Sequence, residues 1–406
     1  MSMLQHKTGP WVFQGPCANS FYHEMMSTIK LEGEVAAPRG LPTLELLHCL
    51  TRVEQPQRRV LTIPGRKLNP FFNMAESLWI LNGQSEAWWI LYFNSQLQKF
   101  LDAPMTDFYG AYGERLRKWP RVKAASAGLV QDIVLEDQLM DCFWTLHTAP
   151  ESRQAAMILR NPIYDKNGKQ TMDRPCNIAV TFKIRQGKLW MSVFNRSNDM
   201  VLGLTSTNIV QFTSLQETLA SWLGVDVGPY SHYSDSLHIY DSQDVQGQTE
   251  HFNVYEYINP LPMRRMTPAE SDGVRTKLYS DVGDLIRQHD NQYIAAELSR
   301  TMDPLACPYW TSVGHALYAY IAHKNLKDWR LALDHIEAMQ TDDWKIECLR
   351  HLADRYAVVN DEPHRSFIDA VNNTFRDIPI RGGLIGARAV WLYVFQSHLD
   401  MLERFI

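Results

Sequence analysis

Residues 174–200 read RPCNIAVTFKIRQGKLWMSVFNRSNDM, and two segments of this stretch have the alternation and β-branched residues typical of strands. A Gln-Gly pair at 186–187 lies between them and predicts a turn. The first strand would begin beside Cys176 and the second would end beside Arg196. Pairing of the two strands as a hairpin would therefore bring a thiol and a guanidinium close together.

Helical and strand patterns alternate on both sides of this hairpin. FYHEMMSTIKLEG (21–33) predicts an amphipathic helix, and NPFFNMAESLWILNG (69–83) predicts a mostly apolar helix that ends at Gly83. We therefore expect residues 1–265 to form an α+β domain.

The pattern changes after LPMRRMTPAESDG (261–273). Long amphipathic segments such as WTSVGHALYAYIAHKNL follow, and several begin with the Thr or Asp residues that favour helix N-termini. We therefore expect residues 266–406 to form a helical C-terminal domain. Two copies of an Asp-Trp helix start occur there, but a solenoid needs more repeats.

Composition limits the functional classes. The 406 residues are 45% apolar and 21% charged, with a net charge of −5, which indicates a folded protein and argues against broad binding to nucleic acid or acidic membranes. The N-terminal residues do not resemble a signal peptide and no stretch predicts a membrane span, so the expected location is cytoplasmic. The six cysteines are scattered, which predicts free thiols and no metal site.

Cys176 is the one cysteine in a suggestive context. A nearby arginine raises the thiolate fraction of a cysteine, and an Arg-Ser pair such as Arg196-Ser197 suits the oxygens of a phosphate. Each feature alone has an ordinary interpretation, since strand cysteines are often buried apolar groups and arginines are often solvated.

The order of the motifs is more specific. PCN, RSND, LGLTSTNI and HYSDSLHIY follow one another, and the sequence here resembles the thymidylate synthase family, including its pyrimidine nucleotide hydroxymethylases. In that family the motifs are Pro-Cys-His, Arg-Ser-x-Asp, Leu-Gly-x-Pro-Phe-Asn-Ile and His-x-x-Gly-Asp-x-His-x-Tyr. Weaker matches, EVAAPRGLPTLEL, MAESLWILNGQSE, AYGERLRKW and APESRQA, extend the resemblance over about residues 20–260.

The resemblance implies a one-carbon transferase that uses 5,10-methylenetetrahydrofolate. It implies that Cys176 adds to C6 of a pyrimidine nucleoside monophosphate, that Glu76 organises water and protons, and that Tyr112 assists proton removal at C5. It places Asn177 at the position of the family's catalytic histidine. The remaining implied contacts are Asn208 with the base, Asn195, His238 and Tyr240 with the nucleoside, and Asp199, Trp79 and Gly203 with the folate.

The resemblance also implies a homodimer. Arg39, Arg196 and Ser197 would hold the 5′-phosphate, and Arg153 would reach the same phosphate from the partner subunit. The fold that the resemblance implies has a large mixed sheet, and this sheet would form the dimer interface.

Several departures from the family pattern bear on the reaction. Asn177 replaces a histidine, Gln154 replaces a second arginine, and LGLTSTNI has an extra residue and lacks a proline. DAPMTDFYG is shorter than the tryptophan-containing stretch of a synthase, and about 140 residues stand where a short closing segment is expected. An aromatic wall and a closing segment exclude water, so their loss favours hydroxymethylation over reductive methylation.

The base, the sugar and the class of protein stay open at this stage. An amide at Asn208 suits the N3–H and O4 of uracil, but the extra residue weakens that inference. The alternatives are methylation, a non-catalytic nucleotide-binding regulator, and a thiol hydrolase or transferase that pairs Cys176 with His232 or His238.

Overall fold

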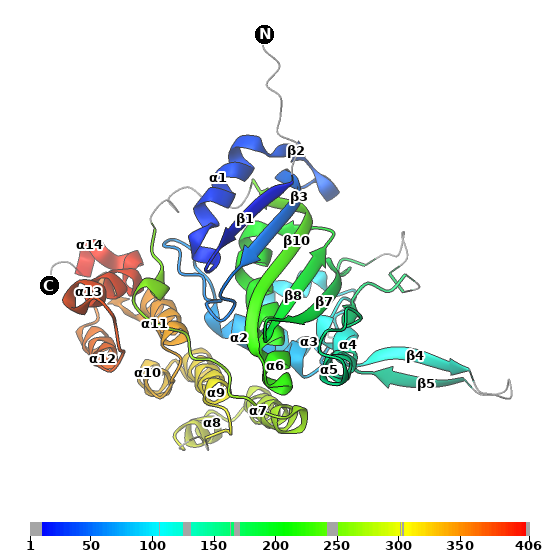
Figure 1. The fold of residues 1–406 in the computed structure, drawn as a ribbon. Coiled ribbons are helices and arrows are strands. Elements are labelled where there is room, and N and C mark those ends of the chain that lie inside the picture. The colour runs from blue at the N-terminus through cyan, green and yellow to red at the C-terminus, as the bar shows by residue number, and fades with distance from the viewer. Residues whose placement is uncertain are drawn as a thin grey trace, which may run out of the picture.

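The computed structural model describes residues 10–104, 106–124, 131–162, 164–165, 171–241, 251–300, 302 and 304–402, with side chains omitted at 121–124 and 131–133. Its central element is an eight-stranded mixed sheet, shown in Figure 1 with α2 and α3 behind the strands. In sheet order the main strands are β1 (Trp11–Gly15), β3 (Thr43–Val53), β10 (Asp226–Tyr240), β8 (Lys188–Asn195), β7 (Asn177–Arg185) and β6 (Ala156–Ile158). Two short strands, β2 (Glu34–Ala36) and β9 (Asn198–Asp199), pair with β3 and β10.

The predicted hairpin is β7 and β8. Gln186 and Gly187 between them have φ angles of 53° and 69°, the positive values that a tight hairpin turn of the right twist requires. The strands pair antiparallel from Arg185 and Lys188 to Asn177 and Asn195. The prediction of two strands around a Gln-Gly turn is thus confirmed.

Helices cover one face of the sheet. The apolar helix expected at 69–83 is α2 (Pro70–Leu81); the Asn69 side chain caps its N-terminus, and Gly83, with φ 67°, follows its end. The other helices of this part are α1 (Tyr22–Glu32), α3 (Ala87–Phe93), α4 (Tyr112–Arg117), α5 (Gln138–Thr148) and α6 (Ile209–Leu223). A π-helical segment, η4 (Met200–Asn208), leads directly into α6.

The opposite face of the sheet carries an apolar row that crosses every main strand. Strand register aligns, in order, Val12, Leu50, Tyr233, Phe194, Ala179 and Ile158. Val12, Tyr233 and Ile158 are 51%, 41% and 44% exposed, and the Tyr233 and Phe194 rings stack with their centroids 5.0 Å apart. An apolar row of this length left open to solvent is typical of an interaction surface.

The C-terminal extension is largely helical, as the sequence predicts. It contains α7 (Pro268–Arg287), α8 (Asn291–Leu298), α9 (Pro308–Ile321), α10 (Trp329–Glu337), α11 (Asp342–Tyr356), α12 (Arg365–Arg376), α13 (Gly383–Val394) and α14 (Leu399–Leu402). Two features break the helical pattern, a two-residue hairpin of β11 (Val358–Val359) and β12 (Glu362–Pro363) and a second π-helical segment, η6 (Ala322–Leu326).

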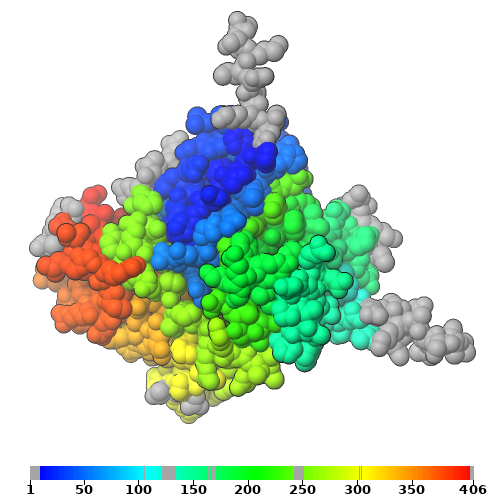
Figure 2. Space-filling model, in the orientation of Figure 1, coloured from blue at the N-terminus to red at the C-terminus, as the bar shows by residue number. Residues whose placement is uncertain are grey.

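The extension shares one continuous apolar core with the sheet and its helices. Figure 2 shows the extension, coloured yellow to red, in direct contact with the green residues that precede it. The boundary at residue 265 stays a prediction; the nearest structural feature is a capping box at Thr267 and Glu270 that opens α7. A second hairpin, β4 (Trp119–Ala124) and β5 (Gln131–Glu136), projects from the other side of the molecule in Figure 1. Over the described residues, no helix is long and apolar enough to span a membrane.

Candidate active site

The hairpin places Cys176 and Arg196 side by side. Because Asn177 pairs with Asn195, the residues just outside that pair are neighbours, and the Arg196 N–H donates to the Cys176 carbonyl at 3.0 Å. The Arg196 guanidinium donates from Nε to the Pro175 carbonyl and from Nη2 to the Arg174 carbonyl, each at 3.1 Å. These bonds fix the approach of the chain to the thiol, and Nη1 donates to none of the described residues.

The Cys176 thiol lies partly buried between opposing charges. Burial raises its pKa, Arg196 and Arg39 lower it, and the carboxyl of Asp173 raises it. The net direction is upward, so the thiol of the unliganded chain is mainly protonated at neutral pH.

Tyr112 faces the same space from the start of α4. Gly113 permits this placement, because a Cβ there would lie 2.9 Å from the Ile80 carbonyl of α2. Burial raises the pKa of Tyr112, the thiol of Cys176 raises it further, and Asn177 lowers it.

Two buried amides next to the thiol lack ordinary partners. The Asn177 side chain is fully buried and approaches the Tyr112 hydroxyl, but neither its Oδ1 nor its Nδ2 makes a hydrogen bond of standard geometry with a described residue. Asn195 Oδ1 is likewise buried without a partner in that part of the chain. Buried polar atoms left unpaired are costly, so they suit a polar ligand that pairs with them.

A chain of polar side chains connects α2 with η4. Gln211 donates from Nε2 to Glu76 Oε2, and Gln211 Oε1 accepts from Asn208 Nδ2 at 3.3 Å. Burial raises the pKa of Glu76 to about 7, and the Gln211 amide lowers it slightly. A carboxyl with a pKa near 7 can both donate and accept a proton at physiological pH.

The extra residue of LGLTSTNI is accommodated by the π-helical geometry of η4. Thr205 Oγ1 and Thr207 Oγ1 donate to the carbonyls of Met200 and Leu202, five residues back in each case. A π-turn holds one residue more than an α-turn, and such turns are frequent at functional sites. The insertion therefore leaves Asn208 facing Gln211.

Asp199 and Gly203 shape the beginning of η4. Asp199 Oδ1 accepts from the N–H groups of Val201 and Leu202 at 2.7 and 3.0 Å, which makes it a helix cap. Gly203 lies against the Asn198 side chain, since a Cβ there would be 2.6 Å from Asn198 Oδ1. Leu202 beside them is 62% exposed, so this end of η4 is open to solvent.

The end of β10 and the loop of Arg39 complete the site. Tyr240 shares the space with Cys176 and Arg39: burial raises its pKa, the charges of Asp199 and Cys176 raise it, and Arg39 lowers it. Burial lowers the pKa of His238, whose ring lies 5.2 Å from that of Tyr240. Arg39, with φ 57°, is exposed in a short 3-10 turn, η2 (Pro38–Gly40).

The structure brings together most of the residues predicted from the sequence, but two lie elsewhere within one chain. Arg153 is exposed near Glu151, whose carbonyl accepts from Arg185 at the far end of β7, roughly 30 Å along the chain from Cys176 at about 3.3 Å per residue. Trp79 is only 4% exposed and packs edge-on against Phe108. Ser197 follows Arg196 directly and is half-buried.

Sequence reasoning missed two polar residues of the site. Gln211 follows Asn208 by three residues on a helix, a spacing that places both on one face and that could have identified it. Asp173 lies three residues before Cys176 in DRPC; burial raises its pKa to about 6, and its Oδ2 accepts from the Gly110 N–H at 2.7 Å.

His232 does not serve Cys176. Its ring nitrogens contact Tyr230 and Asn198 inside the core, and burial lowers its pKa to about 3. This arrangement removes His232 as the base of a thiol hydrolase, since that mechanism needs a cysteine-histidine pair in hydrogen-bond reach.

Comparison with known proteins agrees with this geometry. A model of the thymidylate synthase family matches residues 20–281. The chain is 36% identical over 297 residues to a deoxyuridylate hydroxymethyltransferase of Bacillus phage SP01, covering 69% of this chain and 76% of that protein. It is 32% identical over 220 residues to a protein of the same name from Pseudomonas phage M6, covering 54% and 58%.

A third relative has a different name. A putative thymidylate synthase of Methanothermobacter marburgensis is 28% identical over 212 residues, covering 51% of this chain and 82% of that protein. Enzymes of this family use folate-derived one-carbon donors. The chain therefore belongs to the thymidylate synthase family, and it is an enzyme that transfers a one-carbon unit to C5 of a pyrimidine nucleotide.

Proposed function

We propose that the protein hydroxymethylates C5 of a pyrimidine nucleoside monophosphate of the deoxyuridylate type through a covalent bond between Cys176 Sγ and C6. The observation that carries this proposal is the meeting of a thiol, two arginines and two unpaired buried amides in one space. The names of the relatives from phages SP01 and M6 support the hydroxymethyl product and the uracil base.

Cys176 starts the reaction by forming the S–C6 bond. The thiol loses its proton, and the C5–C6 electron pair moves through C4 to O4, which makes C5 nucleophilic. Arg196 and Arg39 already favour the thiolate electrostatically. Arg196 and Ser197 hold the 5′-phosphate, with Arg39 closing over it from its exposed loop, and His238 and Tyr240 bind the sugar.

Glu76 and Asn208 act on the base. The amide of Asn208 can donate to O4 and accept from N3–H of uracil, and Gln211 holds it in position. Glu76, with its pKa raised to about 7, exchanges protons with O4 through ordered water. Tyr112 and the neighbouring Asn177 assist removal of the C5 proton.

The open end of η4 fits a folate. Leu202 offers an exposed apolar contact and Asp199 can accept hydrogen bonds from a pterin, while Gly203 lets this turn pass close to Asn198, where a Cβ would lie 2.6 Å from Asn198 Oδ1. Methylenetetrahydrofolate would supply a one-carbon unit at the oxidation level of formaldehyde.

The proposed preference for hydroxymethylation rests on access of water. Residues 106–111, the part of the shortened stretch next to Tyr112, form no helix or strand. This stretch contains no tryptophan, and its Phe108 is buried against Trp79, so we propose that water can reach the reacting carbon and add to it.

A homodimer is the proposed assembly. We propose that the exposed apolar row from Val12 to Ile158 pairs with the same row of a second copy about a twofold axis, as identical surfaces do in dimers. Arg153 supports the same assembly, because within one chain it lies far from Arg196 and a partner could bring it to the phosphate.

The test is incubation with dUMP, dCMP, UMP or CMP together with methylenetetrahydrofolate, followed by mass spectrometry of the nucleotide. We expect dUMP to gain a hydroxymethyl group and to release tritium from C5, and we expect Cys176→Ala to abolish both. Cys142→Ala, a buried cysteine of α5, is the matched control and should retain activity. A methyl product would replace the proposed reaction with reductive methylation, and full activity of Cys176→Ala would disprove the covalent mechanism.

A further inference from the structure

Residues 58–69 connect β3 with α2 and form no helix or strand beyond isolated turns. We call them the 58–69 segment. The backbone groups of such a segment need partners from outside it, so its conformation depends on the side chains that supply those partners.

The C-terminal extension supplies several of these partners. Gln396 Oε1 accepts from the Gly65 N–H at 2.9 Å, and Arg350 Nη2 donates to the Leu68 carbonyl at 2.7 Å. Asp343 acts through Tyr255, whose hydroxyl donates to Asp343 at 3.0 Å and accepts from the Val60 N–H at 2.9 Å.

Arg350 is itself fixed in place. Its Nε donates to Glu347 Oε2 at 3.0 Å and its Nη1 donates to Asp354 at 2.9 Å, while the Tyr393 hydroxyl donates to Glu347. These interactions leave the guanidinium one orientation, so its bond to Leu68 is preorganised.

The 58–69 segment in turn holds the first turn of η4. Arg66, which is 7% exposed, donates from Nη2 to the Val201 carbonyl. The N–H of Val201 is one of the two groups that Asp199 caps. Arg66 and Asp199 therefore bind the same turn. Arg66 binds the carbonyl of Val201, and Asp199 binds the N–H groups of Val201 and Leu202.

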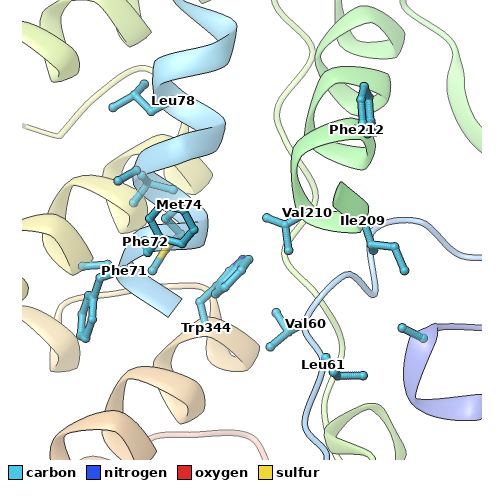
Figure 3. Close-up of a cluster of buried hydrophobic side chains, with 14 of the residues drawn as sticks. Val60, Leu61, Phe71, Phe72, Met74, Leu78, Ile209, Val210, Phe212 and Trp344 are labelled. Carbon is cyan, nitrogen blue, oxygen red and sulfur yellow. The ribbon is translucent and has the colours of Figure 1, made fainter. Parts of the chain in front are cut away.

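Helix α11 also faces η4 directly. Figure 3 shows Trp344 lying between the side chains of α2 and those of Val60, Leu61 and Val210. A cavity of about 10 Å³, enough for about one water, separates Trp344 and Glu347 from Thr205 and Ser206 of η4. The extension and η4 thus meet along a closely packed boundary.

We propose that the C-terminal extension is a fixed positioning element of the active site, acting through Gln396, Arg350 and the 58–69 segment on Arg66 and thereby on η4. Its role is to set the place of Asp199 and Asn208, which lie at the two ends of η4. The identification of the ligand beside Asp199 as folate rests on the proposed function. The coupling between the C-terminal extension and η4 does not depend on that function.

Amide hydrogen exchange of residues 200–204 in the unliganded protein tests the coupling. Gln396 lies at a solvent-accessible bond, so Gln396→Ala should fold normally. We expect exchange to become about fivefold faster, as loss of one net hydrogen bond predicts, and to become faster still in Arg66→Lys. Gln292→Ala, an exposed glutamine of α8, is the matched control and should leave exchange unchanged.

Kinetics separate positioning from general stability. We expect both variants to raise KM for methylenetetrahydrofolate more than they raise the Kd for dUMP, because Arg66 binds the turn that Asp199 caps, whereas Asn208, the proposed contact to the base, lies at the far end of η4. Unchanged exchange at 200–204 in Gln396→Ala would overturn the inference, even if exchange in Arg66→Lys became faster. Absence of product from the unaltered protein would instead overturn the proposed function and leave the exchange result to decide the coupling.

Discussion

Glu76 and Glu217 lie in adjoining helices, α2 and α6, yet their surroundings differ. Glu217 is 2% exposed and accepts from Gln57 Nε2 at 2.6 Å, from the Met263 N–H at 2.8 Å and from Arg59. Among the described residues, Glu76 has Gln211 as its single hydrogen-bond donor and no cation.

This difference separates a structural carboxylate from a functional one. Three donors, one of them a guanidinium, occupy the carboxylate oxygens of the buried Glu217. One neutral amide does not, so burial raises the pKa of Glu76 to about 7. A carboxyl that exchanges protons needs surroundings that leave part of its hydrogen-bonding capacity unfilled.

The largest expected effect comes from breaking the structural pair. Glu217→Ala leaves Arg59 buried without its partner and should destabilise the protein by about 3–5 kcal/mol. Urea unfolding followed by circular dichroism measures the change. The control is Glu297→Ala, which removes the exposed ion pair with Arg300 and should cost less than about 0.5 kcal/mol. Equal losses in the two variants would contradict the structural role of Glu217.

In contrast to Glu217→Ala, Glu76→Gln should lower activity and leave stability intact. The amide keeps the size of the side chain but cannot transfer protons, so we expect kcat to fall by about 10²- to 10⁴-fold. Stability at pH 8 should not fall, because the variant no longer buries a carboxylate. A variant that retains wild-type kcat would refute the proton-transfer role.

The pH dependence of stability gives an independent reading of Glu76. Its pKa in the folded state is raised above 4.5, so the folded state binds the proton more tightly than the unfolded state. Stability from this group is therefore present below about pH 4.5 and is lost as pH rises through about 7, a change of about 3 kcal/mol. Relative to Glu76→Gln, the unaltered protein should thus become less stable between pH 5 and pH 8, as measured by urea unfolding at each pH.

The sequence was sufficient where the structure is set locally. The Gln-Gly turn determines the pairing of β7 and β8, and that pairing alone places Cys176 beside Arg196. Asn69 and Gly83 likewise delimit the helix that carries Glu76.

The sequence was insufficient where the structure depends on distant contacts. No local signal marks η4 as π-helical, since an inserted residue can equally form a bulge or a loop. The 58–69 segment is held in part by Arg350 and Gln396, which lie 282 and 331 residues after the groups that they bind. Its role in the site therefore emerges only once the extension is seen packed against it.

The smallest effects should separate the two glutamates most cleanly, because the same substitution can be made beside each. Gln57→Ala removes one of several donors to Glu217, and we expect a loss of about 1 kcal/mol in stability with kcat unchanged. Gln211→Ala removes the donor that lowers the pKa of Glu76 and also frees Asn208. We expect its kcat to fall about tenfold and the pKa of Glu76 to rise further, as followed by infrared titration of the carboxyl. If Gln57→Ala lowered kcat as much as Gln211→Ala does, the number of donors around a carboxylate would not distinguish structural from functional glutamates in this protein.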